Sequence, residues 1–142
     1  MIINAENLIL GRLASYAAKQ ALLGEEIHIV NCEKAVITGS KENILEKYEK
    51  RIKMGTPFKG PFLSRSSDKI VKRTIRGMVP NYREGRGREA FKRIKCYVRI
   101  PKEFEAAKKI LPGRNKSKLA SKFIRVKELT KWANRKFATN TK

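Results

Sequence analysis

The sequence lacks the features of a membrane or metal protein. It has no long apolar run, secretory leader or lipidation motif, so we expect neither a membrane anchor nor a membrane partner. Its single histidine, His28, and two cysteines, Cys32 and Cys96, form no C-x-x-C or similar ligand pattern, which gives a metal site little support. Both cysteines flank apolar, strand-like segments, so we expect buried, reduced thiols and no disulfide in a reducing cytosol.

Catalytic motifs are also missing. There is no G-x-x-x-x-G-K-[ST] loop. Gly85-Arg86-Gly87 gives the G-x-G of a dinucleotide fingerprint, but Ala90 stands where the third glycine would be and no apolar strand precedes the motif. Asp68 is the only aspartate, and Ser66 and Ser67 have no nearby histidine to act as a base. We expect no catalysis, no cofactor and no small-molecule substrate. The alternative is a nucleotide-binding or nucleic-acid-processing α/β enzyme, which would bind ATP or NAD.

Negative charge is scarce in the later part of the chain. The 142 residues carry 34 Lys/Arg and 13 Asp/Glu, for a net charge of +21. Residues 1–50 hold 6 basic and 7 acidic side chains, whereas residues 51–142 hold 28 and 6. The hydrophobic content of 41% is that of a folded protein, and the length of 142 residues suits one domain with appendages. This asymmetry indicates a neutral scaffold that presents a basic surface.

Apolar periodicity predicts alternating strands and helices. Strand-like runs lie at residues 1–4, 27–30, 35–38 and 96–100, and helical patterns lie at 10–23, 40–53, 66–78, 90–95 and 126–136. This order favours an α/β layer with parallel pairing. Only residues 31–34 separate the second and third strand runs, too few for a crossover helix, so the pattern alone does not place the third strand.

The helix predicted after Ser66 has an unusual charge distribution. Its inward face is predicted to hold Ile70, Val71, Thr74, Ile75 and Met78, and its outward face Lys69, Lys72, Arg73 and Arg76. Like-charged pairs three or four residues apart each cost roughly 0.2–0.5 kcal/mol, and no acid after Asp68 offsets them. The helix at 40–53 instead offers the favourable pairs Glu46–Lys50 and Glu49–Lys53. One hypothesis is a basic face that is simply solvated. An anionic partner, nucleic acid above all, explains better why the charge distributions of the two helices differ.

The residues expected to contact nucleic-acid phosphates fall into three groups. The first is Arg65, Lys69, Lys72, Arg73 and Arg76; the second is Arg83, Arg86, Arg88, Lys92, Arg93 and Lys95; and the third comprises the loop residues Lys53, Lys59, Arg114, Lys116 and Lys118. Gly85 and Gly87 are expected to let the nucleic-acid backbone approach closely. Tyr82 is expected either to stack on a base or to pack under its loop, and Phe91 is assigned to the core.

Four ordered stretches within residues 1–100 carry a resemblance to a known family. They are LGRLA at 10–14, VNCEKAVITGSK at 30–41, IRGMVP at 75–80 and GREAFKRIKCY at 87–97. In these stretches the chain resembles the universal large-subunit ribosomal protein family thirteen, in its archaeal and eukaryotic form.

The resemblance implies a fold, a partner and a location. The fold would be a three-layer α/β/α arrangement around a small, mainly parallel sheet that includes the third strand. Residues 1–100 would form the RNA-binding core and residues 101–142 a basic C-terminal extension with a short terminal helix. The protein would bind large-subunit ribosomal RNA beside neighbouring ribosomal proteins in the cytoplasm and support subunit assembly. Besides this function and the enzyme alternative, a third hypothesis is a general chaperone that binds both DNA and RNA.

Overall fold

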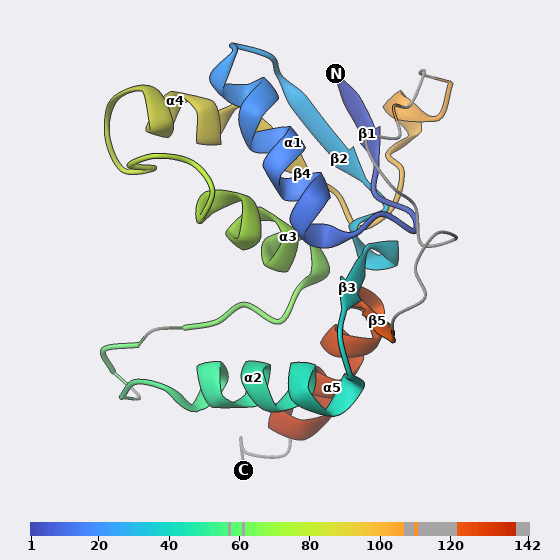
Figure 1. Ribbon diagram of the computed structural model, residues 1–142, viewed down its shortest axis with the longest axis vertical. Coiled ribbons are helices and arrows are strands. Elements are labelled where there is room, and N and C mark those ends of the chain that lie inside the picture. The colour runs from blue at the N-terminus through green and yellow to red at the C-terminus, as the bar shows by residue number, and fades with distance from the viewer. Residues whose placement is uncertain (57, 61, 107–109, 111–121, 139–142) are drawn as a thin grey trace.

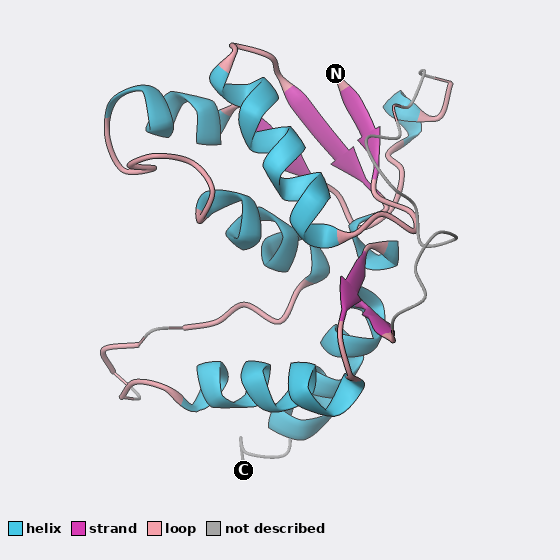
Figure 2. Cartoon of the chain, viewed as in Figure 1, coloured by secondary structure: helices cyan, strands magenta, loops and turns pink. Residues whose placement is uncertain are grey.

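The chain combines five short strands with five longer helices within the described residues, and α2, α3 and α4 follow one another without a strand between them (Figures 1 and 2). The computed structural model describes residues 1–56, 58–60, 62–106, 110 and 122–138. In chain order the elements are β1 (Ile2–Asn4), α1 (Leu10–Leu22), β2 (Ile27–Val30), the 3₁₀ helix η1 (Cys32–Lys34), β3 (Val36–Thr38), α2 (Lys41–Lys53), α3 (Ser67–Arg76), α4 (Gly85–Lys92), β4 (Ile94–Cys96), the 3₁₀ helix η2 (Lys102–Phe104), β5 (Phe123–Arg125) and α5 (Val126–Ala138). No helix in these ranges is long and apolar enough to cross a membrane.

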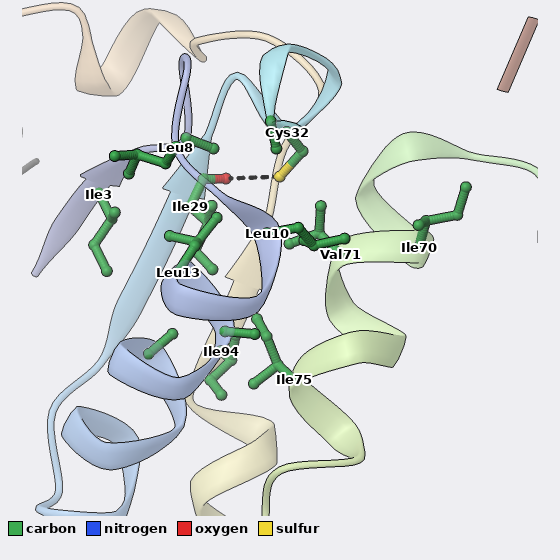
Figure 3. Close-up of a cluster of buried hydrophobic side chains, with 14 of the residues drawn as sticks. Ile3, Leu8, Leu10, Leu13, Ile29, Cys32, Ile70, Val71, Ile75 and Ile94 are labelled. Carbon is green, nitrogen blue, oxygen red and sulfur yellow. Dashed lines mark hydrogen bonds between the residues drawn. The ribbon is translucent and has the colours of Figure 1, made fainter. Parts of the chain in front are cut away.

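A three-stranded parallel sheet, ordered β1-β2-β4, organises the core. Its register aligns Ile3 with Ile29 and Ile27 with Ile94, which places these four fully buried side chains on one face. Figure 3 shows side chains of α1 and α3 packed over this face, and Leu13, Val71 and Ile75 are fully buried among them. The expected α/β fold around a small, mainly parallel sheet is confirmed.

The opposite face of the sheet carries a small aromatic group. The His28 ring lies 6.1 Å from that of Tyr97 and 4.8 Å from that of Phe104, centroid to centroid. Burial, and then the positive charge of Lys95, lower the pKa of His28. The lowered pKa favours the neutral form of this packed ring. Among the described residues, no three His, Cys, Asp or Glu side chains gather where they could hold a metal ion.

The two cysteines are free thiols: Cys32 lies in η1, and Cys96 is the last residue of β4 and is only partly buried, although both were expected to be buried. Cys32 is fully buried, and the neighbouring Cys96 thiol, followed by burial, raises the pKa of Cys32. Its Sγ donates a 3.6 Å hydrogen bond to the carbonyl oxygen of Ile29, which is drawn as a dashed line in Figure 3. Cys32 therefore behaves as a small buried hydrophobe.

The expected parallel placement of the third strand is wrong. β3 does not join the β1-β2-β4 sheet and pairs antiparallel with β5, with Ile37 opposite Ile124. The reason lies at Asn31, which adopts a left-handed backbone with φ +57° and donates a 3.0 Å hydrogen bond from Nδ2 to Asn4 Oδ1. This turn leads β2 directly into η1, and β3 then leaves the sheet.

Two boundaries and one side chain also differ from expectation. The strand predicted at 96–100 lies at Ile94–Cys96, because Ile94 pairs with Ile27 in the sheet. The second basic helix accordingly begins earlier than predicted, at Gly85, and ends at Lys92. Met78 was predicted to face inward but is 43% exposed, because α3 ends at Arg76 and the chain turns before reaching it.

The C-terminal helix packs on the rest of the molecule. Ile124, Val126 and Leu129 are buried in the same hydrophobic cluster as the sheet residues. The Ser67 and Thr130 hydroxyls lie 3.4 Å apart and join the start of α3 to α5. The terminal helix predicted at 126–136 is confirmed, and the division of the chain at residue 100 stays a prediction.

Gly87 is required by close packing within the protein. An added Cβ at this position would lie 1.6 Å from the carbonyl oxygen of Pro80 and 2.8 Å from that of Asn81. Both atoms belong to the backbone, so neither can move aside as a flexible side chain would. Gly87 is buried in this contact, which gives the glycine a structural reason distinct from the expected approach to RNA.

We expect Gly87→Ala to lower the free energy of unfolding by about 1–3 kcal/mol, the usual cost of overpacking. Gly11 in α1 is the matched control, because it is exposed and a Cβ there would meet nothing within 4 Å. Gly11→Ala should therefore raise stability by roughly 0.5–1 kcal/mol. Urea denaturation followed by circular dichroism measures both, and equal midpoints for Gly87→Ala and wild type would contradict the packing account.

Candidate nucleic-acid interface

Helix α3 separates apolar and cationic side chains cleanly. Ser66 precedes it in an extended conformation and Asp68 lies in its first turn, where a negative charge interacts favourably with the helix dipole. Its inward side chains, Ile70, Val71 and Ile75, are buried against the core. Its outward side chains form a row that we name the α3 ridge, consisting of Lys69, Lys72, Arg73 and Arg76.

The α3 ridge has no anionic partner within the described part of the chain, where none of the ion pairs includes a ridge residue. Helix α2 differs. Glu49 there accepts from Lys136 at 2.6 Å and from Lys53 at 2.7 Å, and these bonds lower the pKa of Glu49. The other pair expected in α2, Glu46–Lys50, is not among the ion pairs of the described residues. Within the described residues, α2 therefore has a carboxylate that pairs with nearby cations, whereas the α3 ridge has none.

A hollow lies on each side of the ridge. The first, which we name the aromatic hollow, has a volume of about 260 Å³ and is lined by Phe62, Ser64, Lys69, Lys72, Arg73, Arg76, Tyr82 and Phe91. The second is a cleft between α2 and α3 of about 510 Å³, whose lining includes Tyr48, Arg51 and Leu63. Arg73 and Arg76 line both, so the ridge forms the wall between two cationic depressions.

Aromatic rings lie directly beside the ridge cations. The Arg76 guanidinium carbon is 4.8 Å from the centroid of the Tyr82 ring, and Lys72 Nζ is 5.1 Å from that of Phe91. Arg83 also lies over Tyr82, at 5.6 Å, and its Nε donates a 3.2 Å hydrogen bond to the tyrosine oxygen. That bond lowers the pKa of Tyr82. Phe91, assigned to the core from the sequence, is only partly buried and borders the hollow.

Two arginines of the second expected group bond within the protein. Arg86 Nη2 donates to the carbonyl oxygen of Leu22 at 3.1 Å, and Arg93 Nη1 donates to that of Ala21 at 3.4 Å. These carbonyls lie in the last turn of α1, where helix oxygens need partners from outside the helix. Arg93 also lies 3.7 Å from the Glu89 carboxylate. Both arginines therefore stabilise the end of α1, and RNA contact by them stays a prediction.

The remaining expected residues are spread over several parts of the surface. Arg83, Arg88 and Lys92 are exposed near the aromatic hollow or on α4, Arg65 lies 5.3 Å over the Phe137 ring, Lys53 is paired with Glu49, and Lys59 is exposed in the loop after α2. Lys95 pairs in register with His28 on the opposite face of the sheet. Arg114, Lys116 and Lys118 lie outside the described residues. The structure thus gathers part of the expected set around α3 and α4.

One cationic row was missed by the sequence reasoning. Lys127, Lys131 and Arg135 are all exposed on α5 and follow one another at four-residue spacing. Lys127 Nζ lies 3.7 Å from a carboxylate oxygen of Glu33. The spacing was readable in the sequence once the terminal helix had been predicted, because residues four apart share a helix face.

Comparison with known proteins adds a family. A family model described as ribosomal protein L13 matches residues 1–103. A protein named large ribosomal subunit protein uL13 from Methanococcoides burtonii is 44% identical over 138 residues, covering 96% of this chain and 99% of the relative. The protein of the same name from Methanosarcina barkeri is 45% identical over 139 residues, with the same coverage. That from Methanopyrus kandleri is 50% identical over 106 residues, covering 75% of this chain and 66% of the relative.

The charge contrast between α3 and α2 predicts opposite effects of the same substitution. Lys69→Gln removes two like-charged pairs, with Lys72 and Arg73, so the free protein should gain roughly 0.4–1 kcal/mol of stability at low salt. Lys53→Gln on α2 removes the ion pair with Glu49 and should lower stability. Urea denaturation in dilute buffer and at high salt measures both effects. Loss of stability on Lys69→Gln, or a gain unchanged at about 1 M salt, where charges are screened, would contradict the repulsion.

Proposed function

The chain belongs to the ribosomal protein L13 family, and we propose that it binds large-subunit ribosomal RNA through the α3 ridge and the exposed cations of α4. Family membership makes the chain a structural constituent of the large ribosomal subunit, in the cytoplasm, and not an enzyme. The nucleotide-binding or nucleic-acid-processing enzyme considered from the sequence has no support among these relatives.

The observation that carries the RNA proposal is the unpaired charge of the α3 ridge. Four cations share one helix face within eight residues of sequence, and none of them has an anionic partner in the part of the chain that the structure describes. An isolated surface of this kind repels itself. RNA phosphates would neutralise it and release condensed counterions, which provides a large driving force for association.

Shape and backbone are the features of RNA that this surface suits. RNA helices hide most base edges in a deep, narrow major groove that side chains cannot enter. Proteins therefore contact mainly the phosphates and sugars of these helices. The ridge extends roughly 10 Å along the α3 axis, by the 1.5 Å rise per residue of a helix. Arg88 and Lys92, exposed on α4, would extend the contact beyond the aromatic hollow.

The packing of α3 suits a role in subunit assembly. Its inner face is buried against the core, and the Ser67–Thr130 contact joins its start to α5. The cations are thus carried by an element that is fixed before RNA arrives, which lowers the ordering cost of binding. By neutralising phosphates of RNA segments that meet at the ridge, the protein would reduce the repulsion that opposes their approach. Neighbouring ribosomal proteins would complete the environment.

Charge-matched variants test this proposal. In the ridge variant, Lys69, Lys72 and Arg73 are replaced by glutamine; in the control, Lys19, Lys41 and Lys50, exposed cations of α1 and α2, are replaced likewise. Both lose three positive charges. Filter binding to large-subunit RNA is measured across a salt series. The slope of log affinity against log salt should be smaller in magnitude by about two to three for the ridge variant, because each lost phosphate contact lowers this slope by nearly one.

The control should keep a slope close to that of wild type. If both variants lose affinity and slope equally, total charge and not the α3 ridge governs binding. If the ridge variant binds as wild type does, the interface lies elsewhere on the protein, and the row on α5 is the next surface to test.

A further inference from the structure

We infer that the aromatic hollow takes one unpaired RNA nucleotide, with its base against Tyr82 and its phosphate on the α3 ridge. The inference rests on the proposed RNA-binding function and specifies one contact within it. It adds local recognition of a single-stranded position to an interface that otherwise contacts phosphates.

The rings of the hollow are available in a way that core rings are not. Tyr82 and Phe91 meet edge to face, with centroids 6.3 Å apart and planes inclined by 66°. Both side chains are only partly buried, although Phe91 lies next to fully buried Ala90. The pair therefore fixes the orientation of two rings at the surface. Proteins hold unstacked bases in folded RNA on such surface rings.

The cations around the rings suit a nucleotide better than a purely apolar group. Lys72 and Arg76 lie over the Phe91 and Tyr82 rings, and Lys69 lines the same hollow. A guanidinium plane can itself stack on a base, while the Lys69 ammonium, which forms no ion pair among the described residues, can contact phosphate. One nucleotide supplies a partner for both the rings and the cations, because its flat base and its charged phosphate are separated only by the sugar.

The size and walls of the hollow suit a ligand of one base. Its volume of about 260 Å³ is below the roughly 300–1,000 Å³ of pockets for drug-sized ligands. Phe62, which is 74% exposed, contributes a third ring from the segment before α3. Ser64 adds a hydroxyl that can donate to or accept from a base edge. An acidic side chain of a neighbouring protein would use the cations and leave these rings without a partner.

The test compares Tyr82→Leu with Tyr82→Phe in the full chain. Tyr82→Phe keeps the ring and loses only the hydrogen bond from Arg83, so it should bind large-subunit RNA within about twofold of wild type. Tyr82→Leu removes the stacking surface, and its affinity should fall about tenfold. The slope of log affinity against log salt should not change in either variant, because no cation is removed. Circular dichroism and thermal unfolding identify any loss of fold.

A second measurement places the nucleotide directly. Large-subunit RNA in which 4-thiouridine replaces part of the uridine is bound and irradiated, and the cross-linked peptides are identified by mass spectrometry. The inference predicts cross-links at Tyr82 or Phe91, to uridines that are unpaired in the RNA. If wild type prefers large-subunit RNA to unrelated RNA but Tyr82→Leu binds equally well and these cross-links are absent, the nucleotide site is wrong. If wild type shows no such preference, the proposed function itself fails.

Discussion

The burial of one face of α3 is the constraint on which the rest of the interface depends. Ile70, Val71 and Ile75 can leave water only by packing against the sheet and α1, and this fixes the rotation of the helix about its axis. Once the rotation is fixed, every cation of the α3 ridge must point outward together. Hydrophobic packing thus provides the stabilisation that a self-repelling charged face lacks, and it presents that face on a rigid element.

The surroundings of α3 turn a charged row into a shaped surface. Gly87 allows the first turn of α4 to approach the Pro80 carbonyl, which holds Tyr82 and Phe91 at one side of the ridge. Arg86, bonded to the end of α1, holds α4 there from the other direction. On the far side of the ridge the cleft to α2 stays open. Together these contacts place two depressions of different character beside one line of positive charge.

The sequence predicted what local periodicity determines and missed what depends on distant partners. The burial of Ile70, Val71 and Ile75 in α3 follows from helical spacing alone, and so do the first residues of α1 and α5. The pairing of β3 does not, because its partner β5 lies more than eighty residues away and the deciding feature is the left-handed turn at Asn31. The sequence predicted Arg86 to be available for RNA, because the Leu22 carbonyl that it contacts is distant in sequence and no local pattern indicates the contact.

The proposed function requires that the α3 ridge face ribosomal RNA in the assembled subunit. The most direct measurement is a cryo-electron microscopy map of the large subunit purified with this protein in place. We expect phosphate oxygens within hydrogen-bond distance, roughly 2.7–3.2 Å, of several ridge side chains, including Lys69 or Arg73. A map in which the ridge faces solvent, or contacts only another protein, would contradict it.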